Sequence, residues 1–328
     1  MSNTIFFIDT EYSNQMIASR AIKQYAVDNI TNYLVTTTIS PHSIVFVKSN
    51  LIGLTDEIID QFIKQKAEQE ILVGVLANTA CMVGISGKLR STFLPNIQSF
   101  DEAINNEPIY NLDSHPLKLL NNMNKIIEFE QEIQNKLRQS AIDKGVFLQD
   151  PATTYLAFDT EFGNKVLVEP NVYFGTNVKL HDHVHIRAFS YLEKVEIESG
   201  AKIGPFARIR GDSRIGNNVK IGNFVEIKNS ILDTASSAGH LSYIGDSIIG
   251  KNVNIGAGVV TCNYDGFKKH QTIIADDTFI GSNSSLIAPI TIGTNSFIGA
   301  GSFINQNVPN STFASGRSKQ QMKPNRRK

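Results

Sequence analysis

The most regular feature of the chain is an aliphatic or phenylalanine side chain that recurs every six residues from about residue 162. An α-helix repeats every 3.6 residues, so this period excludes a helix. A six-residue unit with one inward side chain and a turn fits a short strand followed by a corner. The repeating positions are Phe162, Val168, Phe174, Leu180, Ile186 and Leu192, then, after one deleted residue, Ile197, Ile203, Ile209, Ile215, Ile221 and Ile227, then Ile249 and Ile255, and finally Ile274, Ile280, Leu286, Ile292, Ile298 and Ile304.

Three such units close a triangular coil, and stacked coils form a parallel β-helix. We therefore predict a β-helix domain over 147–313. A β-sandwich with coincidental spacing is the alternative, and the persistence of the register over almost the whole C-terminal half disfavours it. The register is interrupted at 228–248 and at 262–273, where we expect loops that project from the coil. Loops on a rigid scaffold are where function usually lies.

The chain before the β-helix predicts a second, smaller domain. Residues 1–115 alternate strand-like runs (5–8, 44–47, 71–76) with helix-like runs (15–27, 56–69), which indicates a small α/β domain. Apolar residues at helical spacing predict one helix over 117–144, within a linker at 116–146, and Gly145 is a natural stop for it. Residues 314–328 form a basic C-terminal tail.

Composition narrows the class of protein. The 328 residues carry 31 basic and 31 acidic side chains, and this balance argues against nucleic acid or a membrane surface as a partner. The N-terminus has no basic region before an apolar run, and no apolar stretch approaches the ~20 residues that span a bilayer, so we expect a cytoplasmic protein. Cys81 and Cys262 lie far apart without a second ligand motif, so we expect two reduced packing residues.

The register places two basic side chains next to each other. Arg210 and Lys228 each follow an inward aliphatic residue by one position and are 18 residues apart, which is one full coil. They should project from one face about one strand spacing apart. Two cations held this close could grip a phosphate group between them. A solvated basic face is the alternative interpretation.

The same spacing of one full coil predicts that small residues stack on adjacent coils. Ser282 and Ala300 are also 18 residues apart, and Ala257 and Asn263 occupy the same phase of the repeat. Small side chains in a column leave a shallow groove in which a long, thin ligand can contact the backbone. The alternative is that small residues merely suit tight corners.

Histidines offer the remaining candidate chemistry. His240 lies in the first interruption, and a neutral imidazole can remove a proton near pH 7, although a lone histidine is often an ordinary polar residue. His181, His183 and His185 alternate within one hexad, and no other histidine lies one coil away. They are poorly placed to converge on one tetrahedral ion, so we predict a solvated turn there and no metal site.

Five segments carry a resemblance to a known family. They are Phe206–Gly211, Gly222–Lys228, Ala238–Asp246, Asn252–Gly258 and Thr261–Gly266. They closely resemble the acetyltransferase half of the bacterial bifunctional N-acetylglucosamine-1-phosphate uridyltransferase/glucosamine-1-phosphate acetyltransferase family. The similarity runs from the helix near residue 117 to about residue 320. The histidine segment together with Cys-Asn-Tyr-Asp-Gly is specific to this family.

The resemblance implies a homotrimer of left-handed β-helices with active sites between subunits. It implies transfer of acetyl from acetyl-CoA to the amine of glucosamine 1-phosphate, giving N-acetylglucosamine 1-phosphate for UDP-N-acetylglucosamine synthesis, without a metal or a covalent intermediate on Cys262. His240 would be the general base, with Glu226 near enough to orient it or raise its pKa. Arg210, Lys228, Tyr243 and Asn254 would hold the sugar phosphate, with Lys269 reaching it from a neighbouring subunit. Ala257, Asn263, Tyr264, Ser282, Ala300 and Arg317 would contact acetyl-CoA.

Two departures from the family pattern matter. Ser237 stands where many members have lysine, which could weaken affinity for CoA or phosphate. Residues 1–113 contain no glycine-rich nucleotide loop, and Val83–Lys88 lacks P-loop spacing and should be a strand and turn. We therefore expect no uridyltransferase activity from this chain, and a role for residues 1–113 in assembly or in separate binding. Alternatives to the acetyltransferase are an inactive β-helix that trimerises the chain and displays the N-terminal domain, or an acyltransferase for another amino sugar.

Overall fold

The structure is a computed structural model that describes residues 4–8, 43–48, 51–52, 71–76, 79–86, 109–111, 118–119 and 123–322. The chain divides into two compact units, Met1–Ile133 and Gln134–Lys328, and each is described by itself. Among the described residues, no helix has the length and apolar character needed to cross a bilayer.

The first unit contains a mixed five-stranded sheet in the order β1-β2-β5-β4-β6. Its strands are β1 (Thr4–Ile8), β2 (Ser43–Lys48), β4 (Ile71–Leu76), β5 (Thr79–Ser86) and β6 (Ile109–Asn111). The three strands predicted here are confirmed, and Val83–Ser86 lies in β5, as expected for a strand rather than a P-loop. The predicted helices at 15–27 and 56–69 lie outside the described residues. A second, two-stranded pairing joins β3 (Leu51–Ile52) to β7 (Lys118–Leu119).

Helix α5 spans Met123–Asp143, so it begins later than the predicted start at 117, because Lys118 and Leu119 belong to β7. The helix ends just before Gly145, the residue that the sequence predicts as its stop. Gly145 has a φ of +87°, its N–H donates to Ile142 O at 2.8 Å, and the N–H of Val146 donates to Ala141 O at 3.1 Å. This pair of bonds is a Schellman motif, in which glycine takes the left-handed conformation that ends the helix.

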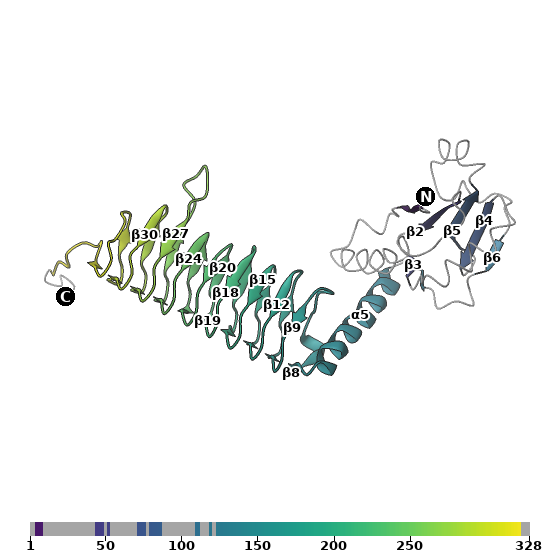
Figure 1. Ribbon diagram of the computed structural model, residues 1–328, viewed down its shortest axis with the longest axis horizontal. Helices are drawn as coiled ribbons and strands as arrows, with labels where there is room; N and C mark the ends of the chain where they lie inside the picture. The colour runs from purple at the N-terminus through teal and green to yellow at the C-terminus, as the bar shows by residue number, and fades with distance from the viewer. Residues whose placement is uncertain are drawn as a thin grey trace, which may run out of the picture. The chain divides into compact units, whose positions relative to one another are not determined.

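The second unit is a parallel β-solenoid whose short strands form three sheets, and its coils stack in a row (Figure 1). We name each sheet after one residue that it carries. The His240 sheet contains β8 (Phe147–Leu148), β10 (Leu167–Val168), β13 (His185–Ile186), β16 (Lys202–Ile203), β19 (Lys220–Asn223), β22 (Ser237–His240), β25 (Asn254–Ile255), β28 (Phe279–Ile280), β31 (Phe297–Ile298) and β33 (Phe313–Ala314).

The Arg210 sheet contains β11 (Tyr173–Phe174), β14 (Tyr191–Leu192), β17 (Arg208–Arg210), β20 (Glu226–Lys228), β23 (Tyr243–Gly245), β26 (Val260–Cys262), β29 (Ser285–Ile287) and β32 (Phe303–Ile304). The Glu196 sheet contains β9 (Glu161–Phe162), β12 (Val178–Leu180), β15 (Val195–Ile197), β18 (Ser213–Ile215), β21 (Ile231–Leu232), β24 (Ser247–Ile249), β27 (Thr272–Ile274) and β30 (Ile290–Ile292). The predicted parallel coil is therefore confirmed.

The six-residue period reflects the core. The repeating aliphatic side chains point inward; Ile186, Ile209 and Ile298, for example, are 0% exposed. Most coil corners hold a residue with positive φ three positions after the inward one, such as His183 at +59° and Asn218 at +56°. Most units therefore have a large inward side chain, a second buried residue two positions before it and a left-handed corner, and together these set the repeat.

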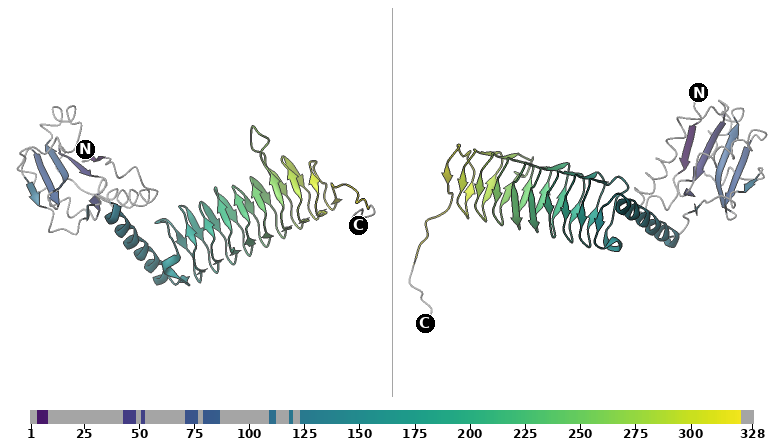
Figure 2. Two further views of the ribbon diagram at one scale, coloured as in Figure 1. Left: turned by 180° about the vertical axis from the view of Figure 1, so that it is seen from behind. Right: turned by 60° about the horizontal axis from the view of Figure 1, so that its bottom comes forward.

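One predicted interruption is wrong and the other is confirmed. Residues 228–248 do not project as a loop, because β21, β22, β23 and β24 continue all three sheets through them. The sequence obscured these coils because two repeats have five residues, from Ile227 to Leu232 and from Ile244 to Ile249, all four of which are buried. Residues 263–271 do leave the coil between β26 and β27, and Figure 2 shows this projecting loop.

The C-terminal half of α5 covers the first coil of the solenoid. Ala141 belongs to the solenoid's hydrophobic core and Leu137 packs against it. Buried Gln134 exchanges two hydrogen bonds with the backbone of Leu156: its Nε2 donates to the carbonyl oxygen at 2.8 Å, and its Oε1 accepts from the N–H at 3.0 Å. The helix thus satisfies backbone groups that an open end of the coil would leave to water.

Candidate active site

Several of the predicted site residues lie around one corner of the solenoid. His240 is the last residue of β22, in the His240 sheet, and Tyr243 is the first residue of β23, in the Arg210 sheet. Between them, Leu241 makes the corner with a φ of +52°. His240 therefore lies on a strand end and not in the extended loop predicted for it. A strand end holds an imidazole more firmly than a loop.

A groove of about 550 Å³ runs along the His240 sheet. Its lining includes four of the predicted residues: His240, Asn254, Ala257 and Ser282. The groove is shallow because glycines line its floor. A Cβ on Gly222, for example, would overlap the carbonyl oxygen of Gly239 on the next coil. Two of the small residues expected to stack, Ala257 and Ser282, line this groove with His240, whereas Ala300 and Asn263 are not among its lining residues.

His240 has a partner that the sequence analysis missed. Asn223 on β19 is the register neighbour of His240, and its Oδ1 lies 2.5 Å from His240 Nδ1. With Asn223 Oδ1 facing the ring, this bond requires the proton on Nδ1, because an amide oxygen can only accept a hydrogen bond. The other ring nitrogen, Nε2, is then left with its lone pair. This is the tautomer that a general base requires.

The groove is also more basic than predicted. Arg187, Lys202 and Lys220 line it, and Lys202 and Lys220 are register neighbours on β16 and β19. They stand 18 residues apart and each precedes an inward isoleucine by one position, so the same arithmetic could have found them. Ser237 is the next residue in this column, and its Oγ donates to Asn254 Oδ1 at 3.1 Å.

On the Arg210 sheet, Arg210 and Lys228 are register neighbours, as the spacing predicts. Arg210 is paired with Glu226: its Nη2 and Nε lie 2.6 and 3.0 Å from Glu226 Oε1. Arg208 Nη1 lies 3.6 Å from the same oxygen. Within this chain Glu226 therefore orients arginines, whereas His240 is held by Asn223. The expected contact between Glu226 and His240 is not formed within the chain.

Lys269 lies beside Lys228 of the same chain. The side-chain contact with Lys228 and the like charge of that residue lower the pKa of Lys269 from its ordinary value, and Asp246 opposes this shift. That Lys269 reaches the sugar phosphate from a neighbouring subunit stays a prediction. Two facing ammonium groups repel each other unless an anion lies between them, which suits a phosphate.

Tyr243, Asn263 and Asp246 form a network next to these cations. Asn263 Nδ2 donates to Tyr243 Oη at 3.4 Å and to Asp246 Oδ2 at 2.5 Å. Asn263 was predicted to contact acetyl-CoA, but its buried side chain lies with Tyr243, a predicted sugar-phosphate residue. Asp246 was not singled out from the sequence, although it lies within the histidine segment.

The other predicted acetyl-CoA residues lie toward the C-terminal end. Arg317 Nη1 donates to the carbonyl oxygen of Ala300 at 2.7 Å, so these two are brought together. Tyr264 stands on the projecting loop, and its Oη donates to Gly266 O at 2.6 Å. Burial raises the pKa of the Cys262 thiol, which disfavours the thiolate and suits a packing residue.

The three alternating histidines contact different partners. His185 Nε2 lies 2.8 Å from Glu169 Oε1, and His181 Nε2 lies 2.9 Å from Glu196 Oε1. His183 forms a corner of the coil with a φ of +59°. Among the described residues, the ligand-type cluster at this place contains His181 with Glu196 and Glu198, and neither His183 nor His185 belongs to it.

Known families and relatives match the hexapeptide-repeat part of this chain. Residues 191–284 match the GMPPB C-terminal domain, and residues 271–306 match the bacterial transferase hexapeptide (six repeats). The bifunctional protein GlmU of Zymomonas mobilis is 47% identical over 204 residues, which are 62% of this chain and 45% of that protein. GlmU of Azorhizobium caulinodans is 48% identical over 204 residues, covering 62% of this chain and 46% of that protein.

This chain therefore spans about half the length of these relatives. Among solved structures, the UDP-N-acetylglucosamine acyltransferase of Campylobacter jejuni covers 50% of this chain and 70% of its own, at 14% identity and a TM-score of 0.34. The hexapeptide-repeat part of this chain is homologous to the matching part of the bifunctional GlmU proteins.

Proposed function

We propose that this chain is an acetyltransferase that acetylates the amine of glucosamine 1-phosphate with acetyl-CoA. The observation that carries the proposal is the arrangement at the Leu241 corner. A histidine with a free Nε2 lies in a groove on one side, and three cations, Arg210, Lys228 and Lys269, lie on the other. A base and a phosphate-binding cluster a few residues apart suit a small amine that carries a phosphate.

The chemistry follows from these residues. An amine attacks a thioester only when it is neutral, so the ammonium group first loses one proton to solvent, and His240 Nε2 takes a second proton from the nitrogen as it attacks. The new C–N bond forms as the C–S bond breaks, and the departing CoA sulfur recovers a proton from the imidazolium. Asn223 Oδ1 accepts the Nδ1 proton throughout and stabilises the charged ring. The backbone N–H groups of the coil could stabilise the oxyanion.

The substrates are assigned to two faces. Arg210, Lys228 and Lys269, with Tyr243 and Asn254, would hold the sugar phosphate. Acetyl-CoA would lie along the groove past Ala257 and Ser282 toward Ala300 and Arg317, with Asn263 and Tyr264 nearby. Arg317 contacts Ala300 in the structure, which supports a binding path that continues to the C-terminal end.

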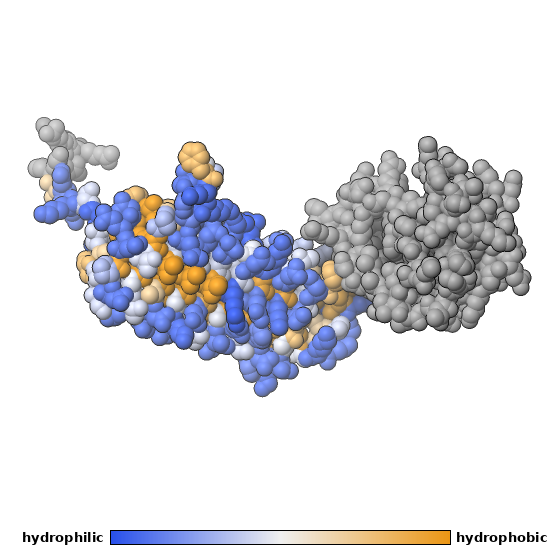
Figure 3. All heavy atoms as spheres, turned by 45° about the horizontal axis from the view of Figure 1, so that its top comes forward, coloured by the Kyte–Doolittle hydropathy of each residue, from blue (hydrophilic) through white to orange (hydrophobic). Residues whose placement is uncertain are grey.

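We propose a homotrimer of left-handed coils. The predicted residues lie on two different sheets of one chain, so a substrate that touches both sets is better enclosed when a second chain packs against this corner. Exposed apolar side chains in the C-terminal half of the solenoid, at this corner and on the Arg210 sheet, support such packing, among them Leu241, Val260 and Phe303. Figure 3 shows hydrophobic residues gathered on one face of this half. Sedimentation that finds a stable, active monomer would contradict the proposal.

The direct test is release of the CoA thiol by the purified chain. We expect it with acetyl-CoA and glucosamine 1-phosphate, and a His240→Ala variant should lose about 10²–10⁴-fold in rate. Galactosamine 1-phosphate and unphosphorylated glucosamine test the alternative amino sugars. Absence of CoA release with every amine, at pH 6 to 9, would favour an inactive scaffold that trimerises the chain.

We further propose that this chain does not transfer uridylyl groups and acts in the cytoplasm. The relatives are bifunctional proteins, but this chain matches only about half of their length. Residues 1–113 contain no glycine-rich loop that could cradle a triphosphate. Pyrophosphate release from UTP and N-acetylglucosamine 1-phosphate, abolished by deletion of residues 1–113, would refute this.

A further inference from the structure

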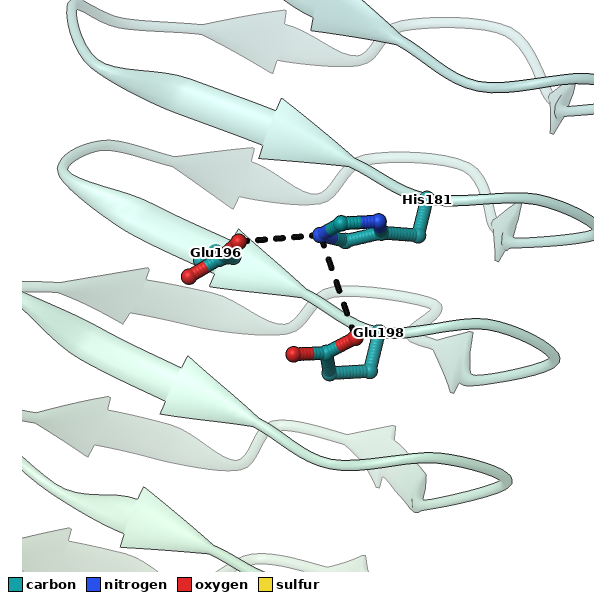
Figure 4. A group of neighbouring side chains, drawn as sticks. All are labelled: His181, Glu196 and Glu198. Atoms are coloured by element: carbon teal, nitrogen blue, oxygen red, sulfur yellow. Dashed lines mark hydrogen bonds and ion pairs between the residues drawn. The ribbon is translucent and has the colours of Figure 1, made fainter.

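A histidine and two glutamates meet on the outer surface of the solenoid, away from the Leu241 corner. His181 follows β12, and Glu196 and Glu198 lie on the next coil, at β15 and directly after it (Figure 4). His181 Nε2 lies 2.9 Å from Glu196 Oε1 and 3.8 Å from Glu198 Oε2. We propose that these three side chains bind one divalent transition-metal cation of the Zn²⁺ type.

The spacing of the donor atoms fits an ion. A Zn²⁺ about 2.0–2.2 Å from each of three nitrogen and oxygen ligands sets those ligands about 3–3.5 Å apart. The three donors here all lie within 4.8 Å of one another, and two of the three pairs have the distances given above. A small rotation of the Glu198 carboxylate therefore completes the set. Solvent would supply a fourth ligand, because all three side chains are partly exposed.

The backbone places these side chains without local flexibility. Leu180 and Ile197 are register partners on β12 and β15, so His181 and Glu198, one position later, are neighbours on adjacent coils. Glu196 and Glu198 flank inward-pointing Ile197 and therefore share the outer side of the strand. Because the coil is fixed by its core, the ligands are held close together before an ion binds.

The neighbouring charges support one carboxylate and oppose the other. Arg214 Nη2 lies 2.7 Å from Glu198 Oε1, so it fixes that carboxylate with Oε2 toward His181. This resembles the outer-shell partners that orient metal ligands. Lys179 Nζ lies 3.8 Å from Glu196 Oε1, the atom that would bind the ion, and its charge weakens binding.

An ion here would tie one coil to the next near the start of the solenoid. An imidazole donor favours Zn²⁺, Co²⁺ or Ni²⁺ over Mg²⁺ or Ca²⁺, which prefer all-oxygen sites. The groove is lined by other residues, so removing the ligands should leave CoA release unchanged. The proposal does not depend on the proposed acetyltransferase activity.

Calorimetric titration of the untagged full chain with Zn²⁺ tests the proposal. We expect one ion per chain, an affinity loss of more than about tenfold in His181→Ala and in Glu198→Gln, and unchanged binding in His185→Ala as the matched control. Circular dichroism checks that each variant keeps its fold, and Glu196→Gln replaces any that does not. No binding, or binding that these changes leave intact, would overturn the proposal.

Two further measurements separate a ligand set from a merely structural cluster. Co²⁺ should give visible ligand-field absorption in the wild type and in His185→Ala, but not in His181→Ala. Lys179→Met should bind Zn²⁺ more tightly, because it removes a positive charge from beside Glu196. Unchanged or weaker binding in Lys179→Met, or Co²⁺ absorption that survives His181→Ala, would contradict the geometry.

Discussion

Replacing Asn223 by alanine isolates the group that fixes the tautomer of His240. Asn223 Oδ1 accepts the Nδ1 proton of His240 at 2.5 Å, from the register-paired position on the preceding coil. Alanine keeps the strand and the groove but removes this acceptor. The imidazole could then carry its proton on either nitrogen, and the imidazolium formed during proton transfer would lose a partner.

The magnitude follows from the change of charge on the ring. A hydrogen bond between neutral groups contributes about 1 kcal/mol and one to a charged group about 1.5–3 kcal/mol, so the transition state gains about 0.5–2 kcal/mol over the ground state. That difference is about 2–30-fold in kcat. His240 is exposed and Asn223 is half-buried, so we expect a value near tenfold. The KM for either substrate should change little.

Thiol-release kinetics across pH distinguish positioning from structural damage. Asn223→Asp keeps an acceptor and adds a negative charge, which raises the pKa of the His240 imidazole. The acidic limb of the kcat–pH profile of this variant should therefore move to higher pH. Asn164→Ala is the matched control, because Asn164 also makes an exposed side-chain bond to a neighbouring coil, at 3.1 Å to Asp182 Oδ1. Wild-type kcat in Asn223→Ala, or an unshifted profile in Asn223→Asp, would refute the assigned role.

Three other predictions concern binding, stability and pH. Arg210→Ala should raise the KM for the sugar phosphate at least tenfold with little effect on the KM for acetyl-CoA, and equal effects on both would contradict its place at the phosphate. Ile209→Ala should cost about 2–5 kcal/mol in urea unfolding, since Ile209 is fully buried, whereas Ile231→Ala at the exposed surface should cost far less. The pKa of Asp265 is lowered by the N–H groups of Lys268 and Phe267 and by His270, so its contribution to loop order is present above about pH 4 and is lost at lower pH. Hydrogen exchange at 263–271 that is faster at pH 6 than at pH 3, after correction for intrinsic rates, would contradict that sign.

Most of the solenoid was predictable because a large buried side chain recurs every six residues along the sequence. The failure at 228–248 has a physical cause. There the inward positions are five residues apart from Ile227 to Leu232 and again from Ile244 to Ile249, and the inward residue between these two pairs is the small Ala238. A search for large aliphatic residues at a strict six-residue period therefore loses the register, although the coil continues.

The site was predictable where it depends on the register and not where it depends on side-chain direction. The pairing of Arg210 with Lys228 follows from whole coils. Asn223 was missed because two six-residue units and one five-residue unit separate it from His240, so the pairing is visible only when the coil continues through 228–248. The partner of Glu226 was not predictable, because a long side chain can turn toward either neighbouring coil.

The helical cover on the first coil has a consequence for how the molecule unfolds. Each coil contacts only its neighbours, so local opening should begin at whichever end is less secured. Gln134 and Leu137 close the first coil, whereas β30, β32 and β33 end the three sheets at the other. Fraying from that end first separates Ala300 from Arg317 and only later reaches His240. Mild heating should therefore weaken acetyl-CoA binding while the sugar-phosphate cluster and most of the coil remain intact. The two binding functions are then lost one after the other, because the C-terminal end of the coil opens first.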